Sequence, residues 1–373
     1  MERIQKELIR RDLQKKMVFL AGPRQTGKTT LAKELAQEFD SWIYLNYDHL
    51  EDRRIIMEEA WLPSVELLIF DEIHKMANWK NYLKGVYDTK RGEQKILVTG
   101  SARLEIFNEV GDSLAGRYFL HRLFPLSPVE CDKANVPYSL DPFLERGGFP
   151  EPFLEEDVIQ ANRWRLQYVD SLLKSDVLDF ETIHHIKAIR LIFELLRERV
   201  GSPTSYTSLA EDVAISPNTV KKYIQILETL YVIFRVPPFS HNIARSLMKE
   251  PKIYFFDTGL VKGDNGVKFE NLVANCLLKH VHAKIDYRGE EYRLRYLRTK
   301  EKQEVDFALV HNQQVEKMIE VKHASDEVGP GLLYFQKKYD LPAILVVKEL
   351  KQEKIVKGIE VVKGLNFLKG LDL

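Results

Sequence analysis

The chain has 373 residues, of which 45% are hydrophobic and 29% charged, a balance typical of globular proteins and a length that predicts two or three domains. Lysine plus arginine equals aspartate plus glutamate, at 55 each, so the total charge gives no sign of a nucleic-acid or membrane partner. The longest apolar runs, such as residues 67–70, are too short to cross a bilayer, so no membrane partner is expected. Residues 1–16 lack the apolar core of a signal peptide, and the two cysteines have no metal-ligand spacing, which predicts a cytoplasmic location.

Residues 1–130 alternate short apolar runs with helical patterns. The runs occupy residues 17–20, 42–45, 67–70, 96–98 and 118–120. Continuous apolar strands separated by helices predict an α/β fold, with a parallel sheet covered by helices on both faces. Pro125, Pro128 and Pro137 cluster where this pattern stops, which predicts a domain boundary.

A phosphate-binding loop follows the first expected strand. The segment matches the P-loop pattern and comprises Gly22, Pro23, Arg24, Gln25, Thr26, Gly27, Lys28, Thr29 and Thr30. Its glycines would let backbone N–H groups curl around the β-phosphate of ATP, at the start of a helix. Lys28 is expected to contact the β- and γ-phosphates and Thr29 to bind Mg²⁺.

Two carboxylates end the third apolar strand. Asp71 is expected to hold Mg²⁺ through water, and Glu72 to polarise the attacking water as general base. A glutamate directly after the aspartate suggests the P-loop ATPases that have an extra strand between the two motifs. A plain acidic strand cap is the alternative.

Two further positions are candidates for the ATPase site. Ser101 or Thr99, at the end of the fourth strand, would hydrogen-bond the γ-phosphate or its water, although Ser101 would equally cap the next helix. Arg117 precedes the last strand, where an arginine in related oligomeric ATPases reaches the γ-phosphate of a neighbouring subunit. A surface or interdomain salt bridge is the equal alternative for Arg117.

The middle of the chain is predicted to be helical from about residue 140 to 240. Residues 189–196 are amphipathic, and residues 208–224 predict a helix, a turn and a second helix. Ser216 would cap this second helix and Pro217 would occupy its first position. In DNA-binding helix-turn-helix proteins the second helix enters the major groove, where Asn218, Lys221 and Lys222 would contact DNA. A packing or lid role is the alternative.

Strands return after residue 250. The apolar runs that predict them are residues 253–256, 304–310, 318–322 and 343–347, with a helical segment at 269–282. We therefore expect an ATPase domain at 1–130, a helical and winged-helix domain at 131–250, and an α/β domain at 251–373.

At this point the chain resembles the prokaryotic AAA-type DExx-box ATPases, in which a P-loop domain is followed by a winged-helix region and a restriction-endonuclease-like domain of unknown function. The resemblance rests on the P-loop and on a series of further short segments in the same order. These segments are 70–73, 99–101, 116–117, 125–130, 147–150, 257–260, 269–271, 304–307 and 319–322. The resemblance implies ATP hydrolysis, and it implies no particular cellular pathway with the same force.

The C-terminal domain carries a candidate metal site. Period-2 alternation puts Glu320 and Lys322 on one face of their strand. A hairpin in register with Asp306 would bring two carboxylates and a lysine together, and Glu270 on the preceding helix would join them. Carboxylates of this kind bind Mg²⁺ or Mn²⁺, which activates water, while the lysine polarises it. Charges that decorate a solvated strand face are the alternative, and the sequence leaves open whether this site cleaves DNA. Arg293, Arg295 and Arg298, with Tyr292 and Tyr296, would grip a phosphate backbone.

The sequence thus predicts an ATP-binding, Mg²⁺-dependent ATPase, expected to form homo-oligomers, with DNA as its partner. Asp306, Glu320 and Lys322 favour DNA processing. The neutral total charge favours the alternative, an ATP-driven oligomerisation switch or scaffold in signalling or defence without nuclease chemistry.

Overall fold

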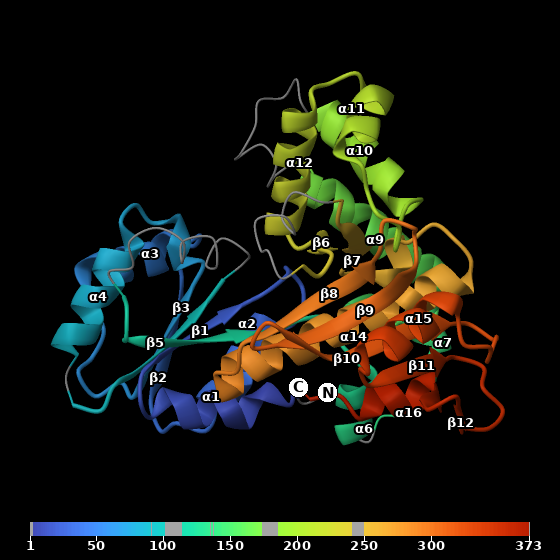
Figure 1. Ribbon diagram of the computed structural model, residues 1–373. Coiled ribbons are helices and arrows are strands. Elements are labelled where there is room, and N and C mark those ends of the chain that lie inside the picture. The colour runs from blue at the N-terminus through green and yellow to red at the C-terminus, as the bar shows by residue number, and fades with distance from the viewer. Residues whose placement is uncertain are drawn as a thin grey trace. The chain divides into compact units, whose positions relative to one another are not determined.

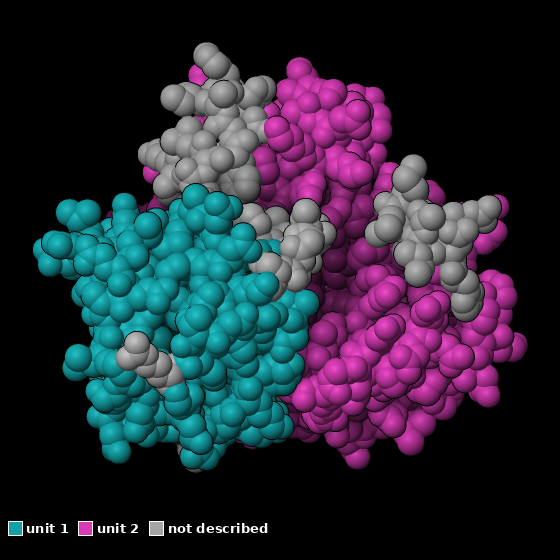
Figure 2. All heavy atoms as spheres, turned by 90° about the vertical axis from the view of Figure 1, so that its left-hand side faces the viewer, with its two compact units in different colours: residues 1–125 teal, residues 126–373 magenta. Residues whose placement is uncertain are grey.

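The computed structural model describes residues 3–90, 92–100, 114–134, 136, 138–173, 186–240 and 250–372. It divides into two compact units, residues 1–125 and 126–373 (Figure 2). Each unit is described by itself below. In the described part of the chain no helix is both long enough and apolar enough to span a membrane.

Unit 1 is a parallel sheet covered on both faces. Its elements are α1 (Gln5–Leu13), β1 (Met17–Ala21), α2 (Lys28–Ala36), β2 (Trp42–Asn46), α3 (Leu50–Glu58), β3 (Leu67–Asp71), η1 (Ile73–Lys75), α4 (Trp79–Thr89), β4 (Lys95–Thr99) and β5 (Tyr118–Arg122). The strand order is β2-β3-β4-β1-β5 and every pairing is parallel. The predicted parallel sheet is confirmed, and β4 lies between the P-loop strand β1 and the acidic strand β3.

Two apolar cores hold this sheet between its helices (Figure 1). On one face, α1 and α2 contribute buried residues such as Ile9 and Leu31. On the other, α3 and α4 contribute Ile56, Trp79 and Leu83. Both faces of β1 and β3 are buried, so these strands are continuous apolar runs, which is why sequence pattern alone located them.

Unit 2 begins with helices and a two-stranded sheet. These elements are α6 (Pro128–Lys133), α7 (Asp141–Glu145), α8 (Pro150–Leu154), α9 (Val158–Ser171), α10 (Ile186–Arg197), α11 (Tyr206–Val213), α12 (Pro217–Thr229), β6 (Ile233–Val236) and β7 (Lys252–Phe255). Strands β6 and β7 pair antiparallel, with Ile233 opposite Phe255. The amphipathic residues 189–196 lie in α10, which buries Ile189, Ile192, Phe193 and Leu196.

A six-stranded mixed sheet completes unit 2. Its elements are η5 (Thr258–Leu260), α14 (Asn265–Arg288), β8 (Tyr292–Arg298), β9 (Glu304–His311), β10 (Gln314–Lys322), α15 (Pro330–Tyr339), β11 (Ala343–Val347), β12 (Lys354–Val356), β13 (Ile359–Lys363) and α16 (Gly364–Lys369). The order is β12-β13-β11-β10-β9-β8. Strands β8, β9 and β10 are antiparallel, and β10, β11 and β13 are parallel. Leu332 and Phe335 of α15 pack on the apolar face of this sheet.

The expected boundary between a middle and a C-terminal domain stays a prediction. Residues 126–373 form one unit, and the predicted division at 250 falls just before β7.

Candidate functional site

The P-loop connects β1 to α2 and depends on two glycines. Gly22 has φ +145°, and a Cβ there would lie 2.3 Å from the carbonyl oxygen of Leu123, so the close approach requires glycine. Gly27, at φ +91°, precedes the first residue of α2. Thr26 is buried and donates its hydroxyl to the Pro23 carbonyl at 2.9 Å. These contacts hold the loop curled at the N-terminus of α2, where backbone N–H groups favour an anion.

The remaining predicted loop residues differ in exposure. Gln25 is exposed and has a left-handed backbone, with φ +61°. Arg24 is half-buried and Thr30 is exposed on α2. Their contact with nucleotide stays a prediction.

Lys28 lies inside the loop. Its ammonium donates to the carbonyls of Gly22 at 3.0 Å and Pro23 at 2.5 Å, and the residue is only 8% exposed. Burial lowers the pKa of Lys28 to about 8, although the nearby carboxylates of Glu72 and Asp71 oppose this shift. The loop therefore holds a cation that an anionic phosphate would stabilise.

Asp71 is the point where four elements meet. Its Oδ2 accepts from Thr29 Oγ1 at 3.2 Å and from Tyr44 Oη at 2.5 Å, while Oδ1 accepts from Thr99 Oγ1 at 2.6 Å. Thr29 comes from α2, Tyr44 from β2 and Thr99 from β4. The oxygens of Thr29 and Asp71 are the hard donors that Mg²⁺ prefers, so these residues fit the ion.

Glu72 lies beside Asp71 in an unusual backbone conformation, with φ +56°, which is a costly position for a non-glycine residue. Its Oε2 is 3.3 Å from Lys75 Nζ and 3.6 Å from His74 Nε2. Burial raises the pKa of Glu72, against the opposing charge of Lys75. A raised pKa brings a carboxylate closer to the range that suits a general base.

The remaining ATPase candidates are Ser101, its alternative Thr99, and Arg117. Ser101 lies outside the described residues, and Thr99 is the residue of β4 that contacts Asp71. Arg117 makes a paired contact with Asp88 at the end of α4, with Nε 2.8 Å from Oδ1 and Nη2 3.1 Å from Oδ2. Its role in hydrolysis stays a prediction.

The predicted carboxylates of unit 2 lie close together. Ile319 pairs with Phe307 across β9 and β10, which puts Glu320 beside Asp306. The Val321 amide donates to Asp306 Oδ2 at 3.0 Å. Lys322 Nζ lies 3.6 Å from Glu320 Oε1. Glu270 of α14 joins the group through a residue that sequence reasoning missed, the buried Lys252.

The predicted helix-turn-helix segment, residues 208–224, lies within two helices, α11 and α12, that begin and end outside it, and the predicted start of the second helix is confirmed. Ser216 accepts the Thr219 amide at 3.1 Å, and Pro217 is the first residue of α12. The buried face of α12 includes Val220, Tyr223 and Ile224. The opposite face carries exposed polar side chains, namely Asn218, Lys221, Lys222 and Gln225.

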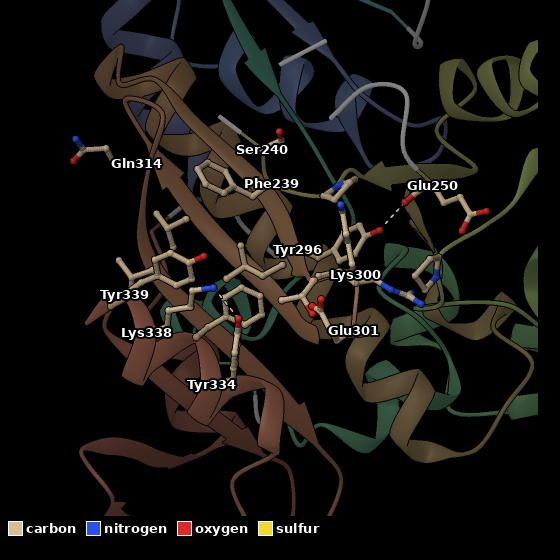
Figure 3. Close-up of a pocket in the computed structure, with 18 residues that line it drawn as sticks. Phe239, Ser240, Glu250, Tyr296, Lys300, Glu301, Gln314, Tyr334, Lys338 and Tyr339 are labelled. Atoms are coloured by element: carbon tan, nitrogen blue, oxygen red, sulfur yellow. Dashed lines mark hydrogen bonds between the residues drawn. The ribbon is translucent and has the colours of Figure 1, made fainter. Parts of the chain in front are cut away.

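Unit 2 also has a cavity of about 1150 Å³ that sequence reasoning missed (Figure 3). Tyr334, Lys338 and Tyr339 of α15 gather at one side, where Lys338 donates to the Tyr334 hydroxyl at 2.8 Å. Tyr296 lies at the other side and donates to the Glu250 carbonyl at 2.7 Å. Tyr292 and Tyr296, which the sequence assigned to a phosphate grip, are both buried in β8, whereas Arg293 and Arg295 are half-buried and Arg298 is exposed. Contact of these arginines with phosphate stays a prediction.

Family models match three stretches of the chain. Residues 14–131 match an AAA domain, residues 138–268 a domain of unknown function (DUF8612), and residues 265–367 another domain of unknown function (DUF4143). An uncharacterized protein of Mycobacterium tuberculosis is 26% identical over 246 residues, which cover 66% of this chain and 55% of that protein. The chain thus spans about half the length of this relative. An uncharacterized protein of Haemophilus influenzae is 24% identical, covering 91% of each chain.

Solved structures show weaker likenesses. A Walker-type ATPase of Pyrococcus abyssi has a TM-score of 0.45 and 14% identity, covering 69% of this chain and 93% of its own. A variant of RuvB from Thermotoga maritima has a TM-score of 0.33 and 19% identity, covering 62% and 88%. The AAA match and the P-loop geometry together support an AAA-type P-loop ATPase domain in residues 14–131.

Proposed function

We propose that this protein is a Mg²⁺-dependent ATPase whose turnover is coupled to DNA binding. The ATPase activity is proposed from one observation. Asp71 accepts hydrogen bonds from Thr29 and Thr99 near the P-loop lysine, and Glu72 directly follows Asp71. Lys28 would neutralise phosphate charge, and Glu72 would take the proton of the attacking water.

Thr29 and Asp71 are the residues that would hold magnesium. When bound, the ion neutralises charge on the phosphate oxygens. Thr99 and Tyr44 fix the two carboxylate oxygens of Asp71 by hydrogen bonds at 2.6 and 2.5 Å. We therefore assign Thr99 and Tyr44 a positioning role, since they orient Asp71.

The exposed face of α12 supports the DNA half of the proposal. Asn218, Lys221 and Lys222 lie on the solvent side of a well-capped second helix, where a helix-turn-helix protein contacts the major groove. For the C-terminal domain we propose an endonuclease-like fold, which the adjacent Asp306 and Glu320 support. DNA cleavage is not part of this proposal, because the buried Lys252, and not Lys322 of the predicted site, lies between Asp306 and Glu270.

The test is ATP hydrolysis by the purified chain with Mg²⁺, alone and with single-stranded, duplex and branched DNA. Lys28→Ala should abolish turnover. Glu72→Gln should keep ATP binding and lower the rate about 10²- to 10⁴-fold, the usual contribution of a general base. Glu51→Gln, an exposed change on α3, serves as the matched control and should leave the rate unchanged.

Normal turnover in both Lys28→Ala and Glu72→Gln would overturn the ATPase assignment. If none of the DNA forms stimulates turnover, the proposed coupling to DNA is wrong and the ATP-driven oligomerisation switch is favoured.

A further inference from the structure

The carboxylates that the sequence assigns to a metal surround a buried lysine. Lys252 begins β7 and is 1% exposed. Its Nζ lies 2.9 Å from Glu304 Oε1, 3.0 Å from Asp306 Oδ1 and 3.7 Å from Glu270 Oε1. Glu304 and Asp306 belong to β9 and Glu270 to α14, so the ammonium of β7 is bound by three carboxylates from two other elements.

The outer oxygens of Asp306 and Glu304 also have protein donors. Asp306 Oδ2 accepts the Val321 amide at 3.0 Å, and Glu304 Oε2 accepts from Arg298 at 3.1 Å. The Tyr254 hydroxyl donates at 2.7 Å to Glu270 Oε1, the oxygen that also lies 3.7 Å from Lys252 Nζ. Protein donors therefore already hold all three carboxylates in their places around the ammonium.

Glu320 is engaged in the same way. Its Oε2 accepts the Gly329 amide at 3.1 Å, and its Oε1 lies 3.6 Å from Lys322 Nζ. Lys322 itself donates to the Glu327 carbonyl at 2.6 Å. Neither side chain is aimed at an ion shared with Glu270.

The charges of the cluster nearly balance without a divalent ion. Lys252, Arg298 and Lys322 are the cations. They face four carboxylates, namely Glu270, Glu304, Asp306 and Glu320. Burial and the charge of Asp306 raise the pKa of Glu270. A buried ion pair is stable only when such partners remain in place.

Distances also separate this cluster from a metal site. Mg²⁺ binds oxygen at about 2.0–2.1 Å, whereas the ammonium–oxygen distances are 2.9–3.7 Å. A divalent ion would have to expel the ammonium and draw the oxygens inward by about 1 Å. Among the described residues, no three histidine, cysteine, aspartate or glutamate side chains are placed to hold one metal ion. The residues do not fit Mg²⁺ or Mn²⁺.

We infer that Lys252 takes the place of the divalent cation in this domain, so that the C-terminal domain has no metal-dependent nuclease centre. Lys252 ties β7 to β9 and α14 as a permanent internal cation. The inference rests on the proposed endonuclease-like fold and is independent of the ATPase half of the proposal.

The test is Mn²⁺ binding to the nucleotide-free full chain, followed by electron paramagnetic resonance of the free ion. Lys252→Met removes the ammonium and keeps the volume, so it should create a Mn²⁺ site at least tenfold tighter than any in the unchanged protein. Adding Asp306→Asn to Lys252→Met should remove that site. Lys279→Met, which removes another buried lysine, paired with Glu130 in the same unit, should create none.

A Mn²⁺ site in the unchanged chain that Asp306→Asn weakens tenfold would overturn the inference. So would a folded Lys252→Met protein that gains no site. If Lys252→Met does not fold, the test is the Tm of the Thr29→Ala variant, measured with and without Mn²⁺. This variant lacks the proposed metal ligand of the ATPase site, so any effect of Mn²⁺ on its Tm must come from another site. Mn²⁺ should leave its Tm unchanged, whereas a rise that Glu320→Gln abolishes would overturn the inference.

ATP turnover is measured on the same preparations. Its loss or retention tests the proposed ATPase and does not alter the interpretation of the Mn²⁺ result.

Discussion

At the scale of single residues, the buried ammonium of Lys28 couples ATP binding to pH. Burial lowers the pKa of Lys28 to about 8 from its usual 10.5. Phosphate beside the ammonium would raise this pKa again, because an opposite charge favours the protonated form. Below about pH 8 the lysine is already protonated and binding takes up no proton. Above that pH, binding must protonate it.

We therefore predict that ATP affinity is level below about pH 8 and falls with rising pH above it, up to about tenfold per pH unit. Calorimetry at pH 9 in two buffers of different ionisation enthalpy should show uptake of nearly one proton, against almost none from Lys28 at pH 7. Lys33→Met, an exposed change on α2, is the control and should retain the uptake. Binding at pH 9 without proton uptake would contradict the prediction.

The same shift affects stability with a definite sign. The unfolded chain holds this proton up to about pH 10.5, whereas the folded chain releases it from about pH 8. The unfolded state therefore binds more protons in this interval, and Lys28 makes the free energy of unfolding rise with pH between these two values. The cost of the buried charge is fully present below pH 8.

At the scale of helices and strands, sequence pattern located the elements that are buried on both faces. The apolar runs at 17–20 and 67–70 correspond to β1 and β3, whose residues are all buried. Strand β8 was missed because Tyr292 and Tyr296 alternate with arginines, a pattern that also suggests a nucleic-acid surface. Lys252 was missed because a lysine at a strand end usually lies in solvent, and only the fold brings three carboxylates around it.

Several segments that carry the family resemblance have structural roles. Asn271 accepts the Phe255 amide at 2.8 Å and donates to the Phe255 carbonyl at 2.9 Å, which fixes β7 against α14. Asp257 pairs with the buried Arg165 at 2.9 Å and caps η5. Sequence alone does not distinguish such buried structural residues from ligand-binding residues, because both are polar side chains at particular positions in a motif.

The exposed face of α12 makes the DNA proposal testable at the level of one helix. Lys221→Ala with Lys222→Ala should weaken duplex binding and abolish DNA stimulation of ATP hydrolysis, while turnover without DNA persists. The log–log salt dependence of affinity should decrease by about 2, roughly one for each lost phosphate contact. Lys337→Ala with Lys351→Ala changes the same charge at exposed positions elsewhere in unit 2. Equal loss in both double variants would show a general charge effect and count against α12.

At the scale of the whole molecule, Arg117 connects the ATPase site to the proposed assembly. In unit 1 its guanidinium is held by Asp88 at 2.8 and 3.1 Å. An exposed pair of this kind contributes little to stability, so Asp88 can release the arginine at small cost. If subunits assemble so that Arg117 reaches a neighbour, its charge would stabilise the transition state there, where such arginines contribute about 10³-fold or more.

We predict that Arg117→Ala and Glu72→Gln each lower turnover at least about 10²-fold and that a mixture of the two regains part of it. In a mixed assembly, a subunit with Arg117→Ala keeps Glu72, and its Glu72→Gln neighbour supplies Arg117, so some sites are complete. Turnover is measured as one inactive variant is titrated into the other at constant total protein. Asp88→Ala should stay active, because it frees the arginine without removing it. Light scattering shows whether the two variants assemble together. If they do, and the mixture is as inactive as each variant alone, Arg117 acts within its own subunit.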